Sequence, residues 1–255
     1  MITKSTDRSF SGHVAIVTGA GSGIGRATAV AFAQAGAHVL GVGRREKPLK
    51  DTAAIDGNIE ILAIDVCEDG APARIVGAAV RRWGRIDHLV NNAGATAVMP
   101  LAETDKKVVQ DLFALNVVAP SLLAHEALPH LRETSGTILN LSSTYGHRPM
   151  AGGAHYAATK AAVEQLTRSW ALELAAEGVR VNSIAPGPTR TDVMLHAGLS
   201  PEAANDMYAY ERERIPTHRI ADAEEVAHWV LRLAEPAGRH ATGQVITVDG
   251  GLELI

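Results

Sequence analysis

The 255-residue sequence contains only one cysteine, Cys67, and few aromatic residues. A single thiol can form neither a disulfide within the chain nor a zinc cluster, so both are excluded and a reducing, cytoplasmic setting is expected. Aromatic residues make up 4% of the chain, whereas 46% of it is hydrophobic. We therefore expect a core of valine, isoleucine, leucine and alanine, as in a parallel sheet that is buried on both faces.

Basic stripes and long hydrophobic runs are absent as well. The formal net charge is −4, and acidic and basic residues are mixed along the chain, so no nucleic-acid partner is expected. Residues 1–11 are polar and contain no hydrophobic signal core. The longest apolar run that we identify, residues 27–42, is broken by polar residues and glycines, and it falls short of the roughly 20 residues of a membrane helix. These features predict a soluble cytoplasmic protein with no membrane partner.

Short aliphatic runs alternate with longer helical patterns along the chain. Runs rich in β-branched residues that end at Gly, Asn, Asp or Ser predict strands, and stretches with helical periodicity lie between them. This alternation is typical of parallel strands joined by right-handed crossovers, so we predict one α/β domain over residues 1–255, with a doubly wound sheet of about seven strands. The expected strands cover residues 14–18, 39–42, 59–65, 89–91, 137–142, 180–185 and 244–248, and the expected helices cover 24–34, 71–83, 106–130, 155–176 and 223–234.

One segment, residues 189–216, departs from this alternation. It carries charged residues, two tyrosines and two methionines, and it leaves the sheet between the sixth and seventh predicted strands. An insertion of this size at the carboxyl end of a strand is a common place for a binding loop. We therefore predict that the segment forms a lid over the substrate.

A glycine-rich turn, residues 18–25, directly follows the first predicted strand and opens the first predicted helix. Glycines at this place allow a tight turn and let backbone N–H groups approach a pyrophosphate, while the helix N-terminus adds partial positive charge. The turn predicts a dinucleotide-binding site, with a glycine-rich loop that binds no ligand as the alternative. The phosphate loop of NTPases, GxxxxGKS/T, is not matched. The residues expected at the cofactor are Gly19, Ser22, Gly23, Ile24 and Gly25.

The turn pattern Thr-Gly-x-x-x-Gly-x-Gly, followed by four further motifs in order, resembles the short-chain dehydrogenase/reductase family. Each motif alone is common, but the ordered set, which covers residues 11–255, is very specific. The resemblance implies a Rossmann-like fold, a homotetramer, and an NAD(P)(H)-dependent oxidoreductase that interconverts a secondary alcohol and a ketone on a small molecule. The further motifs are Asn91-Asn92-Ala93-Gly94 after the fourth strand, Ser143 with Tyr156-x-x-x-Lys160, Pro186-Gly187 after the sixth strand, and Val248-Asp249-Gly250-Gly251 at the seventh.

Tyr156 and Lys160 are four residues apart on a predicted helix, so their side chains project from one face. A free tyrosine has a pKa of about 10, and a nearby ammonium group is expected to lower it. Tyr156 can then donate a proton to a carbonyl oxygen or accept one from an alcohol. Ser143, at the end of the fifth predicted strand, can hold the same oxygen, whereas its neighbour Ser142 should point to the opposite face. The alternative for the Tyr–Lys pair is an amphipathic helix with a packed ring and a solvated amine.

The resemblance also implies roles at the cofactor. Lys160 binds the nicotinamide ribose, and Asn116 holds a water that relays protons from Lys160 to solvent. Relatives often carry an aspartate in place of Gly43, which is followed here by Arg44 and Arg45. Because guanidinium groups pair well with phosphate, NADP is favoured as the cofactor. NAD stays open, since many NADP-preferring relatives carry a basic residue where Ser22 stands. The remaining implied contacts are Asp65 and Val66 at the adenine, Asn92, Ala93 and Gly94 at the adenosine, Thr191 at the carboxamide, and Pro186, Gly187 and Thr189 nearby.

The loop that follows Ser143 should face the substrate, and it contains Tyr145, His147, Arg148 and His155. If these side chains line the pocket, the substrate is polar, such as a sugar, a polyol or a hydroxy acid. An exposed polar loop is the alternative.

Three further possibilities concern a metal site, a regulatory role and a sugar epimerase. A metal site is not expected at His125 and His130, because they are five positions apart and do not share a helix face. A nucleotide-binding regulatory protein without turnover stays open, since a fold does not decide a function. A sugar epimerase-type enzyme with tightly held NAD is the third possibility.

Overall fold

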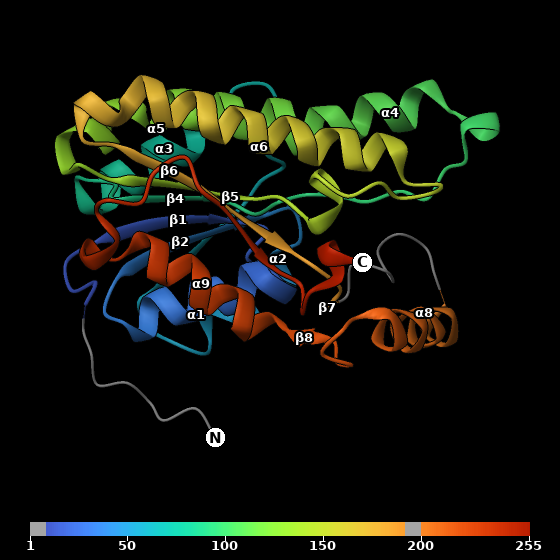
Figure 1. Ribbon diagram of the computed structural model, residues 1–255. Coiled ribbons are helices and arrows are strands. Elements are labelled where there is room, and N and C mark those ends of the chain that lie inside the picture. The colour runs from blue at the N-terminus through green and yellow to red at the C-terminus, as the bar shows by residue number, and fades with distance from the viewer. Residues whose placement is uncertain (1–8, 192–199) are drawn as a thin grey trace.

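The computed structural model describes residues 9–191 and 200–255 (Figure 1). The main strands of the described part are β1 (Val14–Thr18), β2 (His38–Gly43), β3 (Ile59–Ala63), β4 (His88–Asn91), β5 (Thr137–Leu141), β6 (Arg180–Pro186) and β9 (Val245–Val248). Within these ranges they form one seven-stranded parallel sheet in the order β3-β2-β1-β4-β5-β6-β9. The predicted doubly wound sheet is therefore confirmed. Its strand order reverses between β1 and β4, and ligands bind at the carboxyl ends of strands at such a point.

Helices cover both faces of this sheet (Figure 1). Helices α3 (Ala71–Trp83), α4 (Lys106–Phe113), α5 (Ala119–Thr134) and α6 (Ala154–Leu174) form the layer on one face. Helices α1 (Gly23–Gln34), α2 (Glu46–Ala53) and α9 (Ala223–Ala234) form the layer on the other face. The architecture is a single Rossmann-like domain of three layers.

The alternation of side chains along β1 shows how the sheet is buried on both sides. All five residues of this strand are buried. Val14 and Ile16 pack in the core that α3, α5 and α6 cover, whereas Ala15 and Val17 pack in the core beneath α1 and α9. Because successive side chains of a strand point to opposite faces, a strand with helices on both sides is apolar throughout.

The long predicted helix over residues 106–130 is more complex than expected. Helix α4 runs into a π-helical turn (Ala114–Val118) and then into α5, which continues past Pro129 to Thr134. A π-helical turn inserts an extra residue and is frequent at functional sites. Asn116 lies within this turn.

Two helices of the described part were not expected, α2 and α8 (Pro201–Arg214). Helix α8 buries only Ala204 among its residues, so the apolar stripe that predicts a helix is missing from its sequence. It belongs to the predicted lid, whose residues 192–199 lie outside the described residues. The lid also supplies β7 (Thr189–Arg190), which pairs with β8 (Ala221–Asp222). In Figure 1, α8 lies apart from the two helical layers, at the same end of the molecule as β7.

The continuous helical stretch Lys106–Thr134 has the length and hydropathy of a membrane span, a feature that the sequence analysis missed. In the fold, however, this stretch covers one face of the sheet. Leu123, Ala127 and Leu131 are buried in the core shared with α3, and Lys107 forms an exposed ion pair with Asp111. The stretch therefore has the pattern of a surface helix of a doubly wound sheet.

Candidate active site

The glycine-rich turn is tied to the turn that follows β4. Thr18 Oγ1 accepts hydrogen bonds from the backbone N–H groups of Asn92 (3.0 Å) and Ala93 (2.9 Å), and Asn92 Nδ2 donates to the Thr18 carbonyl oxygen (2.8 Å). Gly19 has a φ of +70°, and a Cβ at this position would lie 2.6 Å from Asn92 Nδ2. Only glycine fits such a place. The structure thus brings the two predicted cofactor motifs together at the switch point of the sheet.

The start of α1 has the shape that a pyrophosphate requires. The helix begins at Gly23, and the side chain of its N-cap residue, Ser22, makes no capping hydrogen bond. A Cβ on Gly25 would overlap the carbonyl oxygen of Gly19, and a Cβ on Gly23 would lie 2.9 Å from Thr191 Cγ2. The close packing keeps side chains away from the first turn of the helix, whose N–H groups and partial charge suit a phosphate. These residues therefore fit a dinucleotide.

Arg44 and Asp65 lie at the neighbouring carboxyl ends of β2 and β3. Arg44 Nη1 is 3.8 Å from Asp65 Oδ2, and the arginine side chain is 73% exposed. Asp65 Oδ1 also accepts a hydrogen bond from the Cys67 N–H (3.0 Å), and Val66 packs against the core on the α3 side. Arg45 is exposed and directly precedes α2. Arg44, Asp65 and Val66, three of the residues predicted at the cofactor, thus share one corner of the sheet. A solvated arginine there can turn toward a ligand at little cost.

Tyr156 and Lys160 lie on one face of α6, close to the carboxyl end of β5. Lys160 is buried, its Nζ donates to the Leu141 carbonyl oxygen (2.7 Å), and it lies 5.8 Å from the centroid of the Tyr156 ring. Ser143 follows β5 and is also buried. Its Oγ accepts a hydrogen bond from the Tyr145 N–H (3.2 Å). Helix α6 and the loop after β5 therefore bring the three predicted catalytic residues to one place.

Burial changes the proton affinities of Tyr156 and Lys160. It lowers the pKa of Lys160 to about 8. Burial also raises the pKa of Tyr156, and a hydrogen bond with Ser143 opposes this rise only in part. The expectation that the lysine would lower the tyrosine pKa is therefore wrong for this structure. The reason is that the phenolate loses its hydration, while the Lys160 ammonium is directed at the Leu141 carbonyl group.

Asn116 is buried behind Lys160 and is fully engaged through its side chain. Its Oδ1 accepts from the Ala95 N–H (2.9 Å), and its Nδ2 donates to the Ala95 carbonyl oxygen (2.9 Å) and to Thr159 Oγ1 (3.0 Å). A cavity of about 10 Å³ lies between Asn116, Lys160 and Asn91. This volume is near the minimum for one water molecule.

The two adjacent serines point in different directions, as strand geometry requires. Ser142 Oγ donates to Glu164 Oε1 (3.0 Å) and to the Lys160 carbonyl oxygen (3.2 Å), whereas Ser143 Oγ accepts from the Tyr145 N–H (3.2 Å) and donates to the Pro186 carbonyl oxygen (3.5 Å). Sequence reasoning missed Glu164. Its signal was available, because Tyr156, Lys160 and Glu164 follow one another at intervals of four residues on the same helix face.

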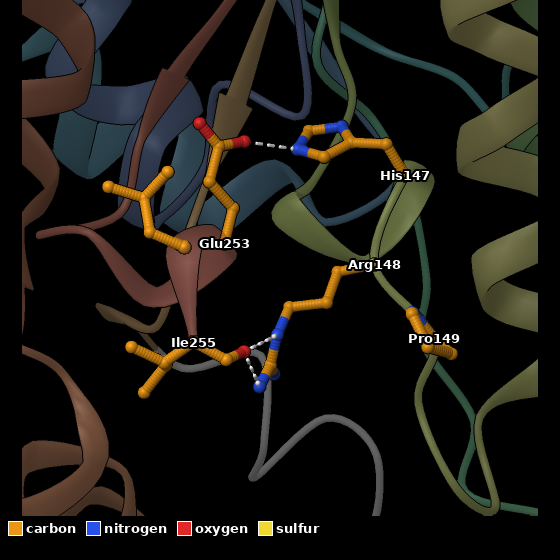
Figure 2. Close-up of a pocket in the computed structure, with 6 residues that line it drawn as sticks. His147, Arg148, Pro149, Glu253 and Ile255 are labelled. Atoms are coloured by element: carbon orange, nitrogen blue, oxygen red, sulfur yellow. Dashed lines mark hydrogen bonds and ion pairs between the residues drawn. The ribbon is translucent and has the colours of Figure 1, made fainter.

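The loop after Ser143 meets the C-terminal residues at a pocket of about 430 Å³ (Figure 2). Figure 2 shows the His147 ring directed at Glu253 and the Arg148 side chain directed at the carbonyl oxygen of Ile255. His155 lies elsewhere, with Nε2 3.5 Å from Thr104 Oγ1. The predicted substrate loop is therefore held by protein contacts at His147 and Arg148.

Tyr145 is half-buried, between the buried Thr144 and the exposed His147, and Glu211 of α8 lies close to it. Burial raises its pKa, and the charge of Glu211 adds to this rise, while Arg148 and Arg214 oppose it. Glu211 Oε2 is buried and has no hydrogen-bond partner among the described residues. Sequence reasoning missed Glu211 as well, since nothing in the sequence of the lid indicates that this carboxylate faces the serine loop (residues 142–149).

The other predicted cofactor residues line the same end of the sheet. A Cβ on Gly94 would lie 3.2 Å from Asn116 Oδ1 and 3.5 Å from Lys160 Nζ. Gly187 packs so closely on Asp249 that a Cβ would lie 2.6 Å from the aspartate Cβ, and the Gly187 carbonyl accepts from Thr189 Oγ1 (2.9 Å). In the described parts of the chain, no group of three His, Cys, Asp or Glu side chains is placed to hold a metal ion.

Comparison with known proteins gives consistent matches over nearly the whole chain. A protein-family model described as enoyl-(acyl carrier protein) reductase matches residues 19–253. A 3-oxoacyl-[acyl-carrier-protein] reductase of Thermotoga maritima is 35% identical, with 95% of this chain and 98% of that protein covered. A 2,3-dihydro-2,3-dihydroxybenzoate dehydrogenase of Escherichia coli is 35% identical, with 96% and 98% covered. The crystal structure of a Caenorhabditis elegans short-chain dehydrogenase/reductase of unknown function, solved with cofactor, matches with a TM-score of 0.91, 33% identity and 97% coverage of both chains.

Proposed function

Because the chain belongs to the short-chain dehydrogenase/reductase family, whose members are nicotinamide-dependent oxidoreductases, we propose that it interconverts a secondary alcohol and its ketone on a small polar molecule. The observation that carries this proposal is the grouping of Ser143, Tyr156 and Lys160 around the carboxyl end of β5. When bound, the nicotinamide cofactor supplies or accepts the hydride.

The side chains supply the proton and hold the reacting oxygen. Tyr156, whose pKa is raised by burial, is protonated at neutral pH and can donate a proton to the ketone oxygen. Ser143 can donate a hydrogen bond to that oxygen as negative charge develops on it. Lys160, whose pKa is about 8, holds its proton loosely enough to exchange it near neutral pH. The small cavity beside Asn116 has room for the water that would connect Lys160 to solvent.

NADP is the cofactor that we propose. Support comes from Arg44, which directly follows β2, is mostly exposed and pairs only weakly with Asp65. A guanidinium group at this place would pair with a ribose 2′-phosphate. No acidic residue stands at Gly43 to bind the 2′-OH of NAD.

Separate titrations of NADPH and NADH test this preference. NADPH should bind more tightly, and Arg44→Ala should lower its affinity about tenfold while leaving NADH unchanged, since a charged hydrogen bond is lost. Lys47→Ala, an exposed lysine on α2 paired with Asp51, is the matched control. Tighter binding of NADH would refute the NADP assignment, and binding of neither would refute the oxidoreductase proposal.

The polar character of the substrate is supported by the side chains near the serine loop. The charges of Glu211, Arg148 and Arg214 act on Tyr145 there, and Arg214 pairs with Glu211 (3.7 Å). In this proposal, α8 acts as part of the lid. A panel of polyols, sugars and hydroxy acids, followed by the absorbance of the reduced cofactor, would identify the substrate class. Turnover confined to apolar alcohols would contradict it.

The two rival functions have their own tests. A regulatory protein without turnover predicts that Tyr156→Phe behaves like the wild type in the cell. An epimerase-type enzyme predicts a purified protein whose cofactor never exchanges. We also propose a cytoplasmic homotetramer, which light scattering of the purified protein and cell fractionation would test.

A further inference from the structure

Glu164 is a buried carboxylate that the proposed reaction does not use. It lies on α6, and its side chain is only 3% exposed. Its Oε1 accepts from Ser142 Oγ (3.0 Å) and is 2.9 Å from His147 Nδ1. Its Oε2 is 3.5 Å from Arg168 Nη2, which lies one helical turn further along α6. A buried carboxylate is costly unless its oxygens are paired, so these partners explain how it is tolerated.

His147 lies between this carboxylate and a second one, Glu253, and Figure 2 shows the contact with Glu253. Its Nε2 is 2.6 Å from Glu253 Oε2, although the two residues are 106 positions apart in the sequence. Glu253 is itself oriented, because the same oxygen accepts from Thr247 Oγ1 (2.9 Å) and its backbone N–H donates to Asp249 Oδ2 (2.8 Å). The histidine therefore bridges helix α6 and the C-terminal turn.

The protonation state of the His147 ring decides whether this bridge can form. A neutral imidazole has one N–H and one lone pair, whereas both ring nitrogens of His147 face carboxylate oxygens. Only the doubly protonated ring donates to both, and losing one proton would direct a lone pair at a carboxylate. Burial lowers the pKa of His147, but the hydrogen bonds and charges of Glu164 and Glu253 outweigh burial, so the pKa is raised. The charged groups packed around the ring are Glu164 and Arg168 from α6 and Glu253 from the C-terminal turn.

Ser143 lies inside the loop that these contacts hold. Ser142 is bound to Glu164 on one side of it, and on the other side Thr144 Oγ1 donates to Asp249 Oδ2 (3.1 Å). The loop also closes tightly over Glu164, since a Cβ on Gly146 would lie 2.5 Å from Glu164 Oε1. The position of Ser143 therefore depends on partners that do not touch the reacting atoms.

We propose that Glu164, His147 and Glu253 form a protonation-dependent clasp, in which the imidazolium of His147 joins the serine loop (residues 142–149) to the C-terminal residues 250–255 and so positions Ser143. Loss of one proton releases the more exposed partner, Glu253, and loosens both segments. The proposal rests on the proposed function only in taking Ser143 as the group that holds the substrate oxygen. His147 and Glu164 are positioning residues.

Hydrogen exchange of the full chain, measured by mass spectrometry at about pH 6 and about pH 9, tests the clasp without a substrate. Protection is calculated by comparing the exchange rate of each peptide with the rate of the same peptide in the unfolded state at the same pH. In the wild type, protection of residues 142–149 and 250–255 should fall about tenfold at the higher pH, because a charged hydrogen bond is lost. The Tyr145 N–H, which donates to Ser143 Oγ, lies in the first peptide and so reports on the position of Ser143.

Two variants and a control make the test specific. His147→Arg keeps its charge and its donors, so protection should be high at both pH values. His147→Gln can donate to one carboxylate only, so protection should be low at both. His130→Gln, which removes another histidine placed near a glutamate (3.7 Å from Glu133), should behave like the wild type.

Equal protection of the wild type at the two pH values, or a His147→Gln protein that matches the wild type, would overturn the proposal. Glu253→Gln gives a second measurement, which should loosen residues 250–255 more than residues 142–149, since Glu164 still holds the serine loop. Equal loosening of the two segments would contradict the assignment of Glu164 as the partner that holds the serine loop and Glu253 as the partner in the C-terminal turn. Exchange requires no turnover, so failure of the clasp and failure of the proposed oxidoreductase reaction are distinguishable.

Discussion

Acid should destabilise this protein through His88, a buried histidine at the opposite end of β4 from the proposed active site. It lies at the start of β4 with 3% of its surface exposed. The rings of Phe10 and Phe32 pack against it, and its two nitrogens lie 2.9 Å from His13 Nδ1 and 2.8 Å from Thr137 Oγ1. Burial, followed by the charge of His13, lowers the pKa of His88 to about 3. The folded protein therefore keeps this ring neutral.

The size of the effect follows from the difference between the folded and unfolded proton affinities. The folded pKa lies below the ordinary value of 6.5, so the stabilisation is complete above that pH and is lost as the pH falls toward 3. Each pH unit below the unfolded pKa lowers the free energy of unfolding by about 1.4 kcal/mol. Going from neutral pH to pH 5 should then remove about 2 kcal/mol of the free energy of unfolding through this one group.

Urea unfolding at fixed protein concentration, followed by circular dichroism at neutral pH and at pH 5, measures this loss. His88→Gln should reduce the difference between the two pH values by about 2 kcal/mol relative to the wild type. His240→Gln, at an exposed histidine, is the control and should leave the difference unchanged. If the wild type and His88→Gln lose the same stability on acidification, the reasoning from burial is wrong.

Two further substitutions test the cofactor turn and the proposed acid. Gly25→Ala would place a methyl group against the Gly19 carbonyl oxygen, so titration should show NADPH affinity reduced at least about tenfold. Gly57→Ala, where nothing lies within 4 Å, is the control. Unchanged affinity in Gly25→Ala would contradict the fit of the glycine-rich turn to a dinucleotide. Tyr156→Phe should lower kcat by a factor of about 10²–10⁴ with unchanged cofactor affinity, because only the proton donor is removed. The exposed Trp229→Phe on α9 should retain full turnover, and a fully active Tyr156→Phe enzyme would exclude the assigned role.

Local patterns in the sequence were sufficient to predict the sheet and most of its helices. The helix Ala71–Trp83 and the strand Val14–Thr18 appear with the predicted bounds, because hydrophobic periodicity and β-branched runs act within a few neighbouring residues. Helix α8 escaped prediction for the same reason, since its sequence lacks an apolar stripe. The ordered motifs also identified the residues that we propose as catalytic.

Only the tertiary structure decided the environment of those residues. The raised pKa of Tyr156 depends on the loss of water around its ring in the folded protein, and the π-helical turn at Asn116 cannot be derived from its neighbours. Likewise, His147 meets Glu253 across 106 residues, a contact that no local pattern encodes. The sequence alone determined which elements form and which chemical groups they carry. Packing determined which of those groups meet, how far water is excluded from them, and therefore which protons they hold.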